Sequence, residues 1–178
     1  MAFSVVLEDE GHTVCRLLLF TDVTNAAEVR KLILSGQVEA SLVKPQMVVE
    51  PFQLVVAANR AVRAQAANKM TTRSLYSEVI FNLSTKKNVG NALKTFGLGE
   101  ADTETLAVVL GSEGEVDARV EKITGQVKGK TTALSELSGL TQEAQVRELY
   151  KVTEEELVTG SLLEAVVSRM ACRDFLSL

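Results

Sequence analysis

Residues 50–97 organise the chain and read EPFQLVVAANRAVRAQAANKMTTRSLYSEVIFNLSTKKNVGNALKTFG. Pro51 stands where a helix can begin, because the first N–H groups of a helix have no partner within it. The sixteen residues after it contain no helix breaker, and apolar positions spread over most of the helical wheel. We therefore predict a buried helix, since a helix that is apolar around most of its girth is normally buried. Gln53, Arg60 and Arg63 share one narrow arc, which we expect to reach solvent.

The same stretch carries an excess of positive charge. From Lys44 to Lys94, eight lysines and arginines stand against two glutamates, a net charge of +6. The whole chain has 19 basic and 23 acidic side chains, so the remainder carries −10. Such asymmetry is typical of a patch that binds a polyanion on an otherwise acidic body. A face of solvated lysines without a ligand is the alternative that the charge pattern leaves open.

Length and composition are typical of one globular domain that covers residues 1–178. The chain is 46% apolar and 24% charged, and only two prolines argue against long linkers. Its apolar runs are too short to span a membrane, and the first residues lack the pattern of a signal peptide. Cys15 and Cys172 are therefore predicted to be reduced and buried, in a protein of the cytoplasm and nucleus.

Runs of β-forming residues and helix capping patterns predict a mixed α/β (α+β) fold, with a small central sheet surrounded by helices. The predicted strands are residues 12–20, 38–43 and 105–110, with a short edge strand near 126–130. Besides the central helix, the predicted helices cover residues 26–34, 74–83, 89–95, 116–123 and 140–150. Two capping boxes, Thr153 with Glu156 and Ser161 with Glu164, predict a short helix followed by a longer one at the end of the chain.

The last predicted helix has an unusually wide apolar surface. Leu163, Val166, Val167 and Met170 form one apolar face, and Leu162 extends it sideways. Such a helix either fills the core of its own domain or docks on a partner. Periodicity alone does not assign each residue to one of these two roles.

The sequence contains no recognisable catalytic or metal-binding pattern. His12 is the single histidine, and an isolated histidine is more often structural than catalytic. No Cys/His spacing fits zinc, and neither a glycine-rich phosphate loop nor a GxSxG nucleophile motif occurs. Trp is absent and aromatic residues make up 4%, which argues against a base-stacking platform. We predict a binding protein without catalytic residues, metal or cofactor.

Three ordered blocks carry a resemblance to a known family. They are EPFQ at residues 50–53, KMTTRSLYSEVIFNLS at 69–84 and NVGNALKTFG at 88–97, with further likeness at 17–26 and 160–170. The chain resembles the TPRKB-type family, the subunits that bind the atypical kinase PRPK in the KEOPS/EKC complex. The resemblance implies a non-catalytic subunit at the end of a linear assembly, bound to the N-lobe of the kinase. That complex installs N-threonylcarbamoyl on adenosine in ANN-decoding tRNAs, and family members help recruit tRNA through its 3′ CCA tail.

The resemblance gives the charged and apolar residues specific expected roles. For tRNA backbone contacts, we expect Lys69 and Arg73 first, followed by the basic side chains Arg60, Arg63, Lys86 and Lys87. Asn82 and Ser84 are expected to hydrogen-bond single-stranded bases. The expected kinase contacts are the apolar residues of the last helix, Leu162, Leu163, Val166, Val167 and Met170. The alternative is a regulator or scaffold that binds the kinase and has no direct contact with tRNA.

Overall fold

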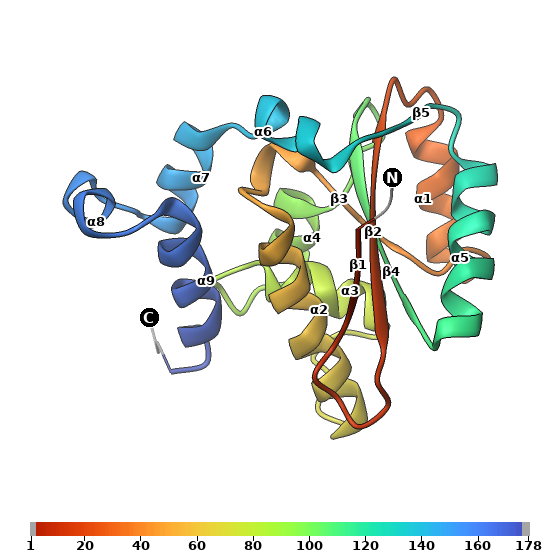
Figure 1. The fold of residues 1–178 in the computed structure, drawn as a ribbon, viewed down its shortest axis with the longest axis horizontal. Coiled ribbons are helices and arrows are strands. Elements are labelled where there is room, and N and C mark those ends of the chain that lie inside the picture. Colours follow the sequence, from red (N-terminus) through yellow and green to blue (C-terminus); the bar gives the residue numbers. More distant parts are fainter. Residues whose placement is uncertain (1–2, 176–178) are drawn as a thin grey trace.

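The computed structural model describes residues 3–175, and its centre is the antiparallel pair of β2 (Val14–Thr21) and β4 (Thr105–Gly111) (Figure 1). The pairing runs from Val14 opposite Gly111 to Phe20 opposite Thr105. β1 (Phe3–Val6) and β5 (Lys130–Thr132) both pair with β2, and β3 (Ser41–Val43) pairs with β4. All pairs are antiparallel, so the mixed α+β class with a small central sheet is confirmed.

Helices cover both faces of this sheet. Within the described residues they are α1 (Ala26–Leu34), α2 (Pro51–Ala66), α3 (Leu75–Asn82), α4 (Val89–Phe96), α5 (Glu113–Gln126), α6 (Leu137–Leu140), α7 (Glu143–Tyr150), α8 (Glu154–Thr159) and α9 (Leu162–Cys172). Two short 3-10 turns, η1 (Pro45–Met47) and η2 (Leu134–Glu136), precede α2 and α6. Within residues 3–175, none of these helices is long and apolar enough to cross a membrane.

Two hydrophobic cores lie on opposite faces of the sheet. Along β2, Leu17 and Leu19 belong to the core under α2, α3, α7 and α9, whereas Leu18 and Phe20 belong to the core under α1 and α5. This alternation is what a strand requires, because successive side chains point to opposite faces. Figure 1 shows α1 and α5 on one side of the sheet and the other large helices on the opposite side. The central strands are therefore buried on both faces, as their apolar sequence predicts.

Most elements agree with the sequence patterns, and the differences have local causes. The helix over 26–34 has the predicted bounds, and both predicted capping boxes are present. The strand predicted over 38–43 is shorter, because the N–H groups of Gln37 and Val38 bond to the carbonyl of Leu32 after α1. β1 has no counterpart among the predicted strands, since it is a four-residue edge strand with a largely exposed surface.

Gly97 is required by close packing at the point where α4 meets the sheet. It forms a β-bridge with Val43, and a Cβ atom there would lie 2.5 Å from the carbonyl oxygen of Leu93. Real Cβ atoms essentially never approach an atom that closely. The glycine therefore lets α4 end directly against β3.

Candidate functional site

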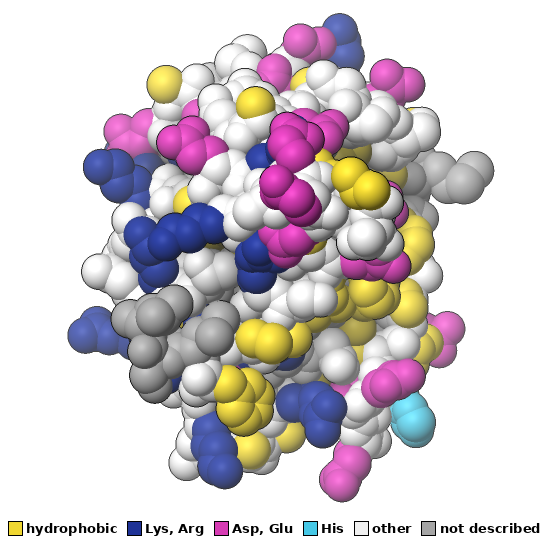
Figure 2. Space-filling view, turned by 90° about the vertical axis from the view of Figure 1, so that its left-hand side faces the viewer, with side chains coloured by type: hydrophobic (Ala, Val, Ile, Leu, Met, Phe, Trp, Pro, Cys, Tyr) yellow, Lys and Arg dark blue, Asp and Glu magenta, His cyan; other side chains and the backbone are white. Residues whose placement is uncertain are grey.

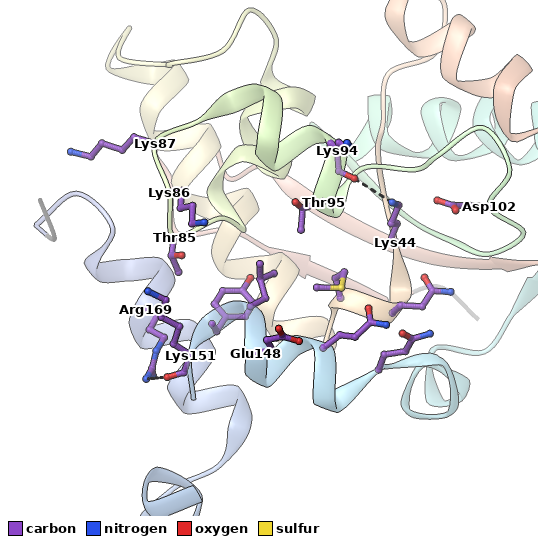
Figure 3. Close-up of a pocket in the computed structure, with 16 residues that line it drawn as sticks. Lys44, Thr85, Lys86, Lys87, Lys94, Thr95, Asp102, Glu148, Lys151 and Arg169 are labelled. Carbon is purple, nitrogen blue, oxygen red and sulfur yellow. Dashed lines mark hydrogen bonds between the residues drawn. The ribbon is translucent and has the colours of Figure 1, made fainter. Parts of the chain in front are cut away.

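A large open groove of about 1760 Å³ lies between η1, the α3–α4 loop and α7. The end of α4 and one side chain of α9 complete its walls, as Figure 3 shows. The backbone ties these walls together, because the N–H of Gln142 bonds to the carbonyl of Gln46 at 2.9 Å. Thr141 also donates its hydroxyl to the carbonyl of Val48 at 2.6 Å. The groove is thus a concave surface on a fixed frame.

Positive charge dominates this surface, which we call the basic groove. Its charged lining residues are the cations Lys44, Lys86, Lys87, Lys94, Lys151 and Arg169 and the anions Asp102 and Glu148. Within residues 3–175, none of the five lysines takes part in an ion pair. Arg169 is different, because it lies 2.8 Å from Glu156. A concave wall of unpaired cations focuses a positive potential and attracts polyanions.

The floor of the basic groove combines apolar surface with fixed polar groups. Met47, Leu149 and Tyr150 lie there together with the hydroxyls of Thr85 and Thr95. The Tyr150 hydroxyl donates to the carbonyl of Leu83, and burial raises the pKa of this phenol well above its ordinary value. It therefore stays protonated and structural. Such a floor suits the sugar and base of a polynucleotide, while the lysines suit its phosphates.

The two lysines of the α3–α4 loop are held out by local capping. The Ser84 hydroxyl accepts a hydrogen bond from the N–H of Lys86 at 3.0 Å, and Asn88 caps α4 by accepting from the N–H of Asn91 at 2.9 Å. Lys86 and Lys87 lie between these two fixed points and are exposed. Figure 3 shows both at the rim of the groove. The loop thus presents them to solvent without burying either charge.

Of the residues predicted to contact tRNA, only Lys86 and Lys87 line the basic groove. Arg63, Lys69 and Arg73 are exposed, but they lie at the other end of α2 and in the α2–α3 loop. We call these three residues the loop cluster. α2 has 16 residues, which corresponds to about 24 Å. It begins beside η1 and carries the loop cluster to the lower edge of Figure 1.

Glu78 builds the α2–α3 loop from inside. Its carboxylate is 3% exposed and accepts from the N–H of Thr71 at 3.1 Å, the N–H of Thr72 at 2.8 Å and the Thr72 hydroxyl at 2.7 Å. Ser74 then caps α3 by accepting from the N–H of Ser77 at 3.1 Å. The loop is therefore a fixed, convex turn, and its cations project from it rather than around a cavity.

Three other predicted tRNA contacts are corrected, because the fold itself uses their polar groups. Asn82 is 2% and Ser84 5% exposed; Asn82 donates to the carbonyl of Ala57 and accepts from Arg173. Neither side chain is free to hydrogen-bond a base. The Arg60 guanidinium is bound to the carbonyl of Met170 and to Asp174, so it joins two helices instead of forming an open basic stripe. Gln53, expected on the same stripe, is fully buried.

The apolar surface of α9 divides into an inner and an outer part. Val166 and Met170 are fully buried in the core, and Leu162 packs against it. The prediction that Val166 and Met170 contact the kinase is therefore corrected, because neither residue has surface open to a partner. Leu163 and Val167 are only partly buried. Figure 2 shows the face with α8 and α9, where hydrophobic side chains gather beside a group of acidic ones.

Four cations of the basic groove were not among the predicted contacts. Lys44 and Lys94 were counted in the positive stretch, but no motif distinguished them. Lys151 and Arg169 lie in the acidic remainder of the sequence, so the charge asymmetry points away from them. The packing of α7 and α9 against the α3–α4 region brings them to the groove. No local sequence signal contains that information.

Among residues 3–175, no group of His, Cys, Asp and Glu is placed to hold a metal ion. Burial raises the pKa of the Cys15 thiol to about 12, so this cysteine is inert at neutral pH. Cys172 corrects the expectation that both cysteines are buried, because it is exposed. His12 is exposed at a turn with φ of 48°.

Comparisons with known proteins identify a family and named relatives. Residues 20–174 match the sequence model of the family described as kinase-binding protein CGI-121. The chain is 43% identical over 157 residues to the EKC/KEOPS complex subunit TPRKB of Danio rerio, covering 88% of this chain and 89% of the relative. It is 26% identical to the EKC/KEOPS complex subunit CGI121 of Coccidioides immitis, covering 80% and 71% of the two chains.

Proposed function

This chain belongs to the kinase-binding protein CGI-121 family, and on that premise we propose that it is a non-catalytic subunit of a KEOPS/EKC-type complex. In this proposal it acts in the cytoplasm and nucleus, and the complex makes N-threonylcarbamoyl-adenosine in ANN-decoding tRNAs. The chain binds the PRPK-type kinase directly and reaches the other subunits through it. The observation that carries the proposal is the family match over residues 20–174 together with 43% identity to a relative named as such a subunit.

The outer part of α9 is the proposed kinase-docking surface. Val166 and Met170 anchor the helix in the core, which leaves Leu163 and Val167 on a flank with partial exposure. A helix with its inner face fixed can present such a flank to a partner without unfolding. The centre of a protein interface is poor in charged residues and is surrounded by a polar rim, which an apolar flank beside acidic side chains can provide.

The basic groove is the proposed contact for tRNA. Its lysines come from separate elements and surround a floor of apolar and hydroxyl groups, which matches a single-stranded end better than a duplex. Release of counterions from the phosphates would supply most of the affinity. We therefore expect tRNA binding to weaken steeply as the salt concentration rises. The chain thereby supports recruitment of tRNA through its acceptor end, while another subunit performs the chemistry.

A kinase-binding scaffold without tRNA contact is the second candidate function. One observation favours it: the residues first expected to contact tRNA, Lys69 and Arg73, lie on a convex loop outside the groove, and Arg60 is occupied within the fold. In this case the basic groove would be a solvated surface. Absence of tRNA binding by the chain alone and by its kinase complex, with kinase affinity intact, would support the scaffold.

The test of kinase docking is the affinity of a purified PRPK-type kinase for Leu163→Glu, measured by titration calorimetry. We expect a loss of at least about tenfold, because a charge would be desolvated in the interface. Leu34→Glu is the matched control, since Leu34 is 81% exposed on α1 at the opposite face of the sheet. Equal affinity of the folded Leu163→Glu variant and the wild type would contradict the docking surface.

A further inference from the structure

Two buried or half-buried arginines connect the end of α9 to the helices beneath it. Arg173, directly after α9, is 4% exposed. Its guanidinium donates to the carbonyl of Phe81 at 2.6 Å and to Asn82 Oδ1 at 3.0 Å. It also stacks on the Phe81 ring, with 4.0 Å between the guanidinium carbon and the ring centroid. These acceptors lie at the C-terminal end of α3, where carbonyl groups have no partner within the helix.

Arg60 makes the equivalent contact with α9 itself. It projects from α2 and donates to the carbonyl of Met170, which is in the last turn of α9. Its second terminal nitrogen lies 2.8 Å from Asp174 Oδ2. α2 therefore caps α9 through Arg60, and the residue after α9 caps α3 through Arg173. Cations at helix C-termini are favourable because the helix dipole places partial negative charge there.

Asp174 lies between the two guanidinium groups and offsets part of their charge. Oδ2 pairs with Arg60, and Oδ1 lies 3.6 Å from Nε of Arg173. Burial, and after it the charge of Arg60, lowers the pKa of Arg173, whereas the carboxylates of Asp174 and Glu78 oppose that shift. Removing one member thus removes a charged cap from a helix end or leaves an unbalanced charge near the core.

We propose that Arg60, Arg173 and Asp174 form a clamp that fixes the angle of α9 and so positions Leu163 and Val167 for the kinase. This inference rests on the proposed docking through α9, and it makes the three clamp residues positioning residues that do not themselves contact the kinase. Arg60 thereby receives a role other than nucleic-acid binding. The N-terminal end of α9 has its own fixed point in the Ser161–Glu164 capping box, and Arg169 in the last turn pairs with Glu156 of α8.

The clamp affects kinase affinity through the population of docked α9. When only a fraction of the molecules holds a helix in its binding position, the apparent dissociation constant rises by the inverse of that fraction. A tenfold loss of affinity therefore corresponds to about one molecule in ten with α9 in place. The loss should appear together with faster local hydrogen exchange in α9, whereas the sheet stays protected.

Arg60→Met tests the clamp, because methionine keeps an apolar stem and removes the donors to Met170 and Asp174. In the free full-length chain we expect faster amide exchange over residues 162–172, unchanged exchange in β2 and β4, and about tenfold weaker kinase binding. Arg60→Lys should restore part of the affinity, since an ammonium group can still bond one of the two acceptors. Arg30→Met is the matched control, because Arg30 pairs with Glu100 at 3.4 Å in an arginine–carboxylate contact that belongs to α1.

The outcomes separate the clamp from the docking surface. Unchanged exchange in α9, or unchanged kinase affinity in Arg60→Met while Leu163→Glu loses binding, would overturn the clamp alone. A wild-type chain that does not bind the kinase would overturn the proposed docking, and the clamp's role in it. Faster exchange in α9 with a matching loss of affinity, absent from Arg30→Met, is the result that the clamp requires.

Discussion

The basic groove and the loop cluster carry the same kind of side chain on opposite kinds of surface. The lysines of the groove come from η1, the α3–α4 loop, α4 and α7, and they surround a concavity. The three cations of the loop cluster are close together in sequence, with Arg63 in the last turn of α2 and with Lys69 and Arg73 in the convex loop built on Glu78. Neither set is neutralised by ion pairs within residues 3–175, Arg169 excepted. The two regions therefore differ in the shape of their surface and in the number of separate elements that supply their cations. The number of charges in one stretch of sequence does not distinguish them.

The difference matters because a concave wall concentrates the field of several cations on one ligand. On a convex turn, water and salt screen each charge separately, with a Debye length of about 8 Å at physiological ionic strength. In a groove, several ammonium groups reach neighbouring phosphates of one chain, and each contact releases a counterion. We therefore expect the same number of cations to bind a polyanion more strongly in the groove than on the loop.

Glu78→Ala tests whether the loop cluster is a product of the fold, and it has the largest expected effect. It removes the acceptor of two part-buried N–H groups and of the Thr72 hydroxyl, so the free energy of unfolding should fall by about 3 kcal/mol. This corresponds to a decrease in Tm of about 6–12 °C for a chain of this size. Denaturation by urea and by heat would measure it.

Two comparisons make that result specific. Glu50→Ala should change stability little, since Glu50 is exposed and makes no side-chain cap bond to α2. The affinity of folded Glu78→Ala for tRNA should equal that of the wild type, because the groove lies at the other end of α2. A variant as stable as the wild type would show that the buried carboxylate does not hold the loop.

Replacing three groove lysines, Lys86, Lys87 and Lys94, by alanine should weaken tRNA binding by roughly a hundredfold at 0.1 M salt. The slope of log affinity against log salt should become shallower by about two to three units, because three phosphate contacts are lost. Fluorescence polarisation of labelled tRNA over a salt series would measure both quantities.

The loop cluster provides a control that removes the same number of charges. Arg63→Ala/Lys69→Ala/Arg73→Ala should lower the affinity by less than about threefold and leave the slope nearly unchanged. A larger loss in the loop variant than in the groove variant would reverse the comparison and return the tRNA contact to the loop. Equal losses would mean that net charge alone determines binding.

Glu156→Gln should have the smallest effect and act in the opposite direction. Glutamine keeps the capping box with Thr153, but it releases Arg169 from its ion pair and adds a free cation to the groove. We expect tRNA affinity to rise about twofold at low salt. No gain in tRNA affinity by the folded variant would mean that the pairing of Arg169 does not limit the groove.

The same substitution predicts a dependence of stability on pH. The backbone N–H of Thr153 and, after it, Arg169 lower the pKa of Glu156 below its usual 4.5. A lowered pKa stabilises the fold above pH 4.5, and this contribution disappears as the pH falls through the folded value. The difference in Tm between wild type and Glu156→Gln should therefore be constant near neutral pH and vanish in acid. A difference in Tm that persists well below pH 4.5 would contradict the assignment of this stabilisation to the ionised Glu156 carboxylate.

Residues close in sequence account for what could be predicted. The bounds of α1, the caps at Asn88, Thr153 and Ser161, and the two central strands all follow from side chains within four positions of one another. Hydrogen bonds of caps and the periodicity of helices and strands have that range. β1 could not be predicted in this way, because it forms a strand through its pairing with β2 and not through a pattern in its own four residues.

The site was predicted in part, and its errors have one cause. Lys86 and Lys87, two of the cations predicted to contact tRNA, do line the groove, and their contact with tRNA stays a prediction, whereas Asn82 and Ser84, expected to reach bases, are buried. Polar residues in a basic stretch look alike in sequence whether they face water or satisfy a helix end. Arg60 and Arg63 are one turn apart, and only the arrival of α9 separates their roles.

By itself, the sequence determined most of the elements, their caps, the uneven charge of the two parts of the chain and the amphipathic last helix. Only the tertiary structure decided which cations share a surface, which apolar residues of α9 remain partly exposed and which arginines hold helix ends. The physical reason is that hydrophobic burial determines how α7 and α9 pack on α2 and α3, and this force is non-directional. It places Lys151 and Arg169 beside Lys86 regardless of any charge pattern along the chain.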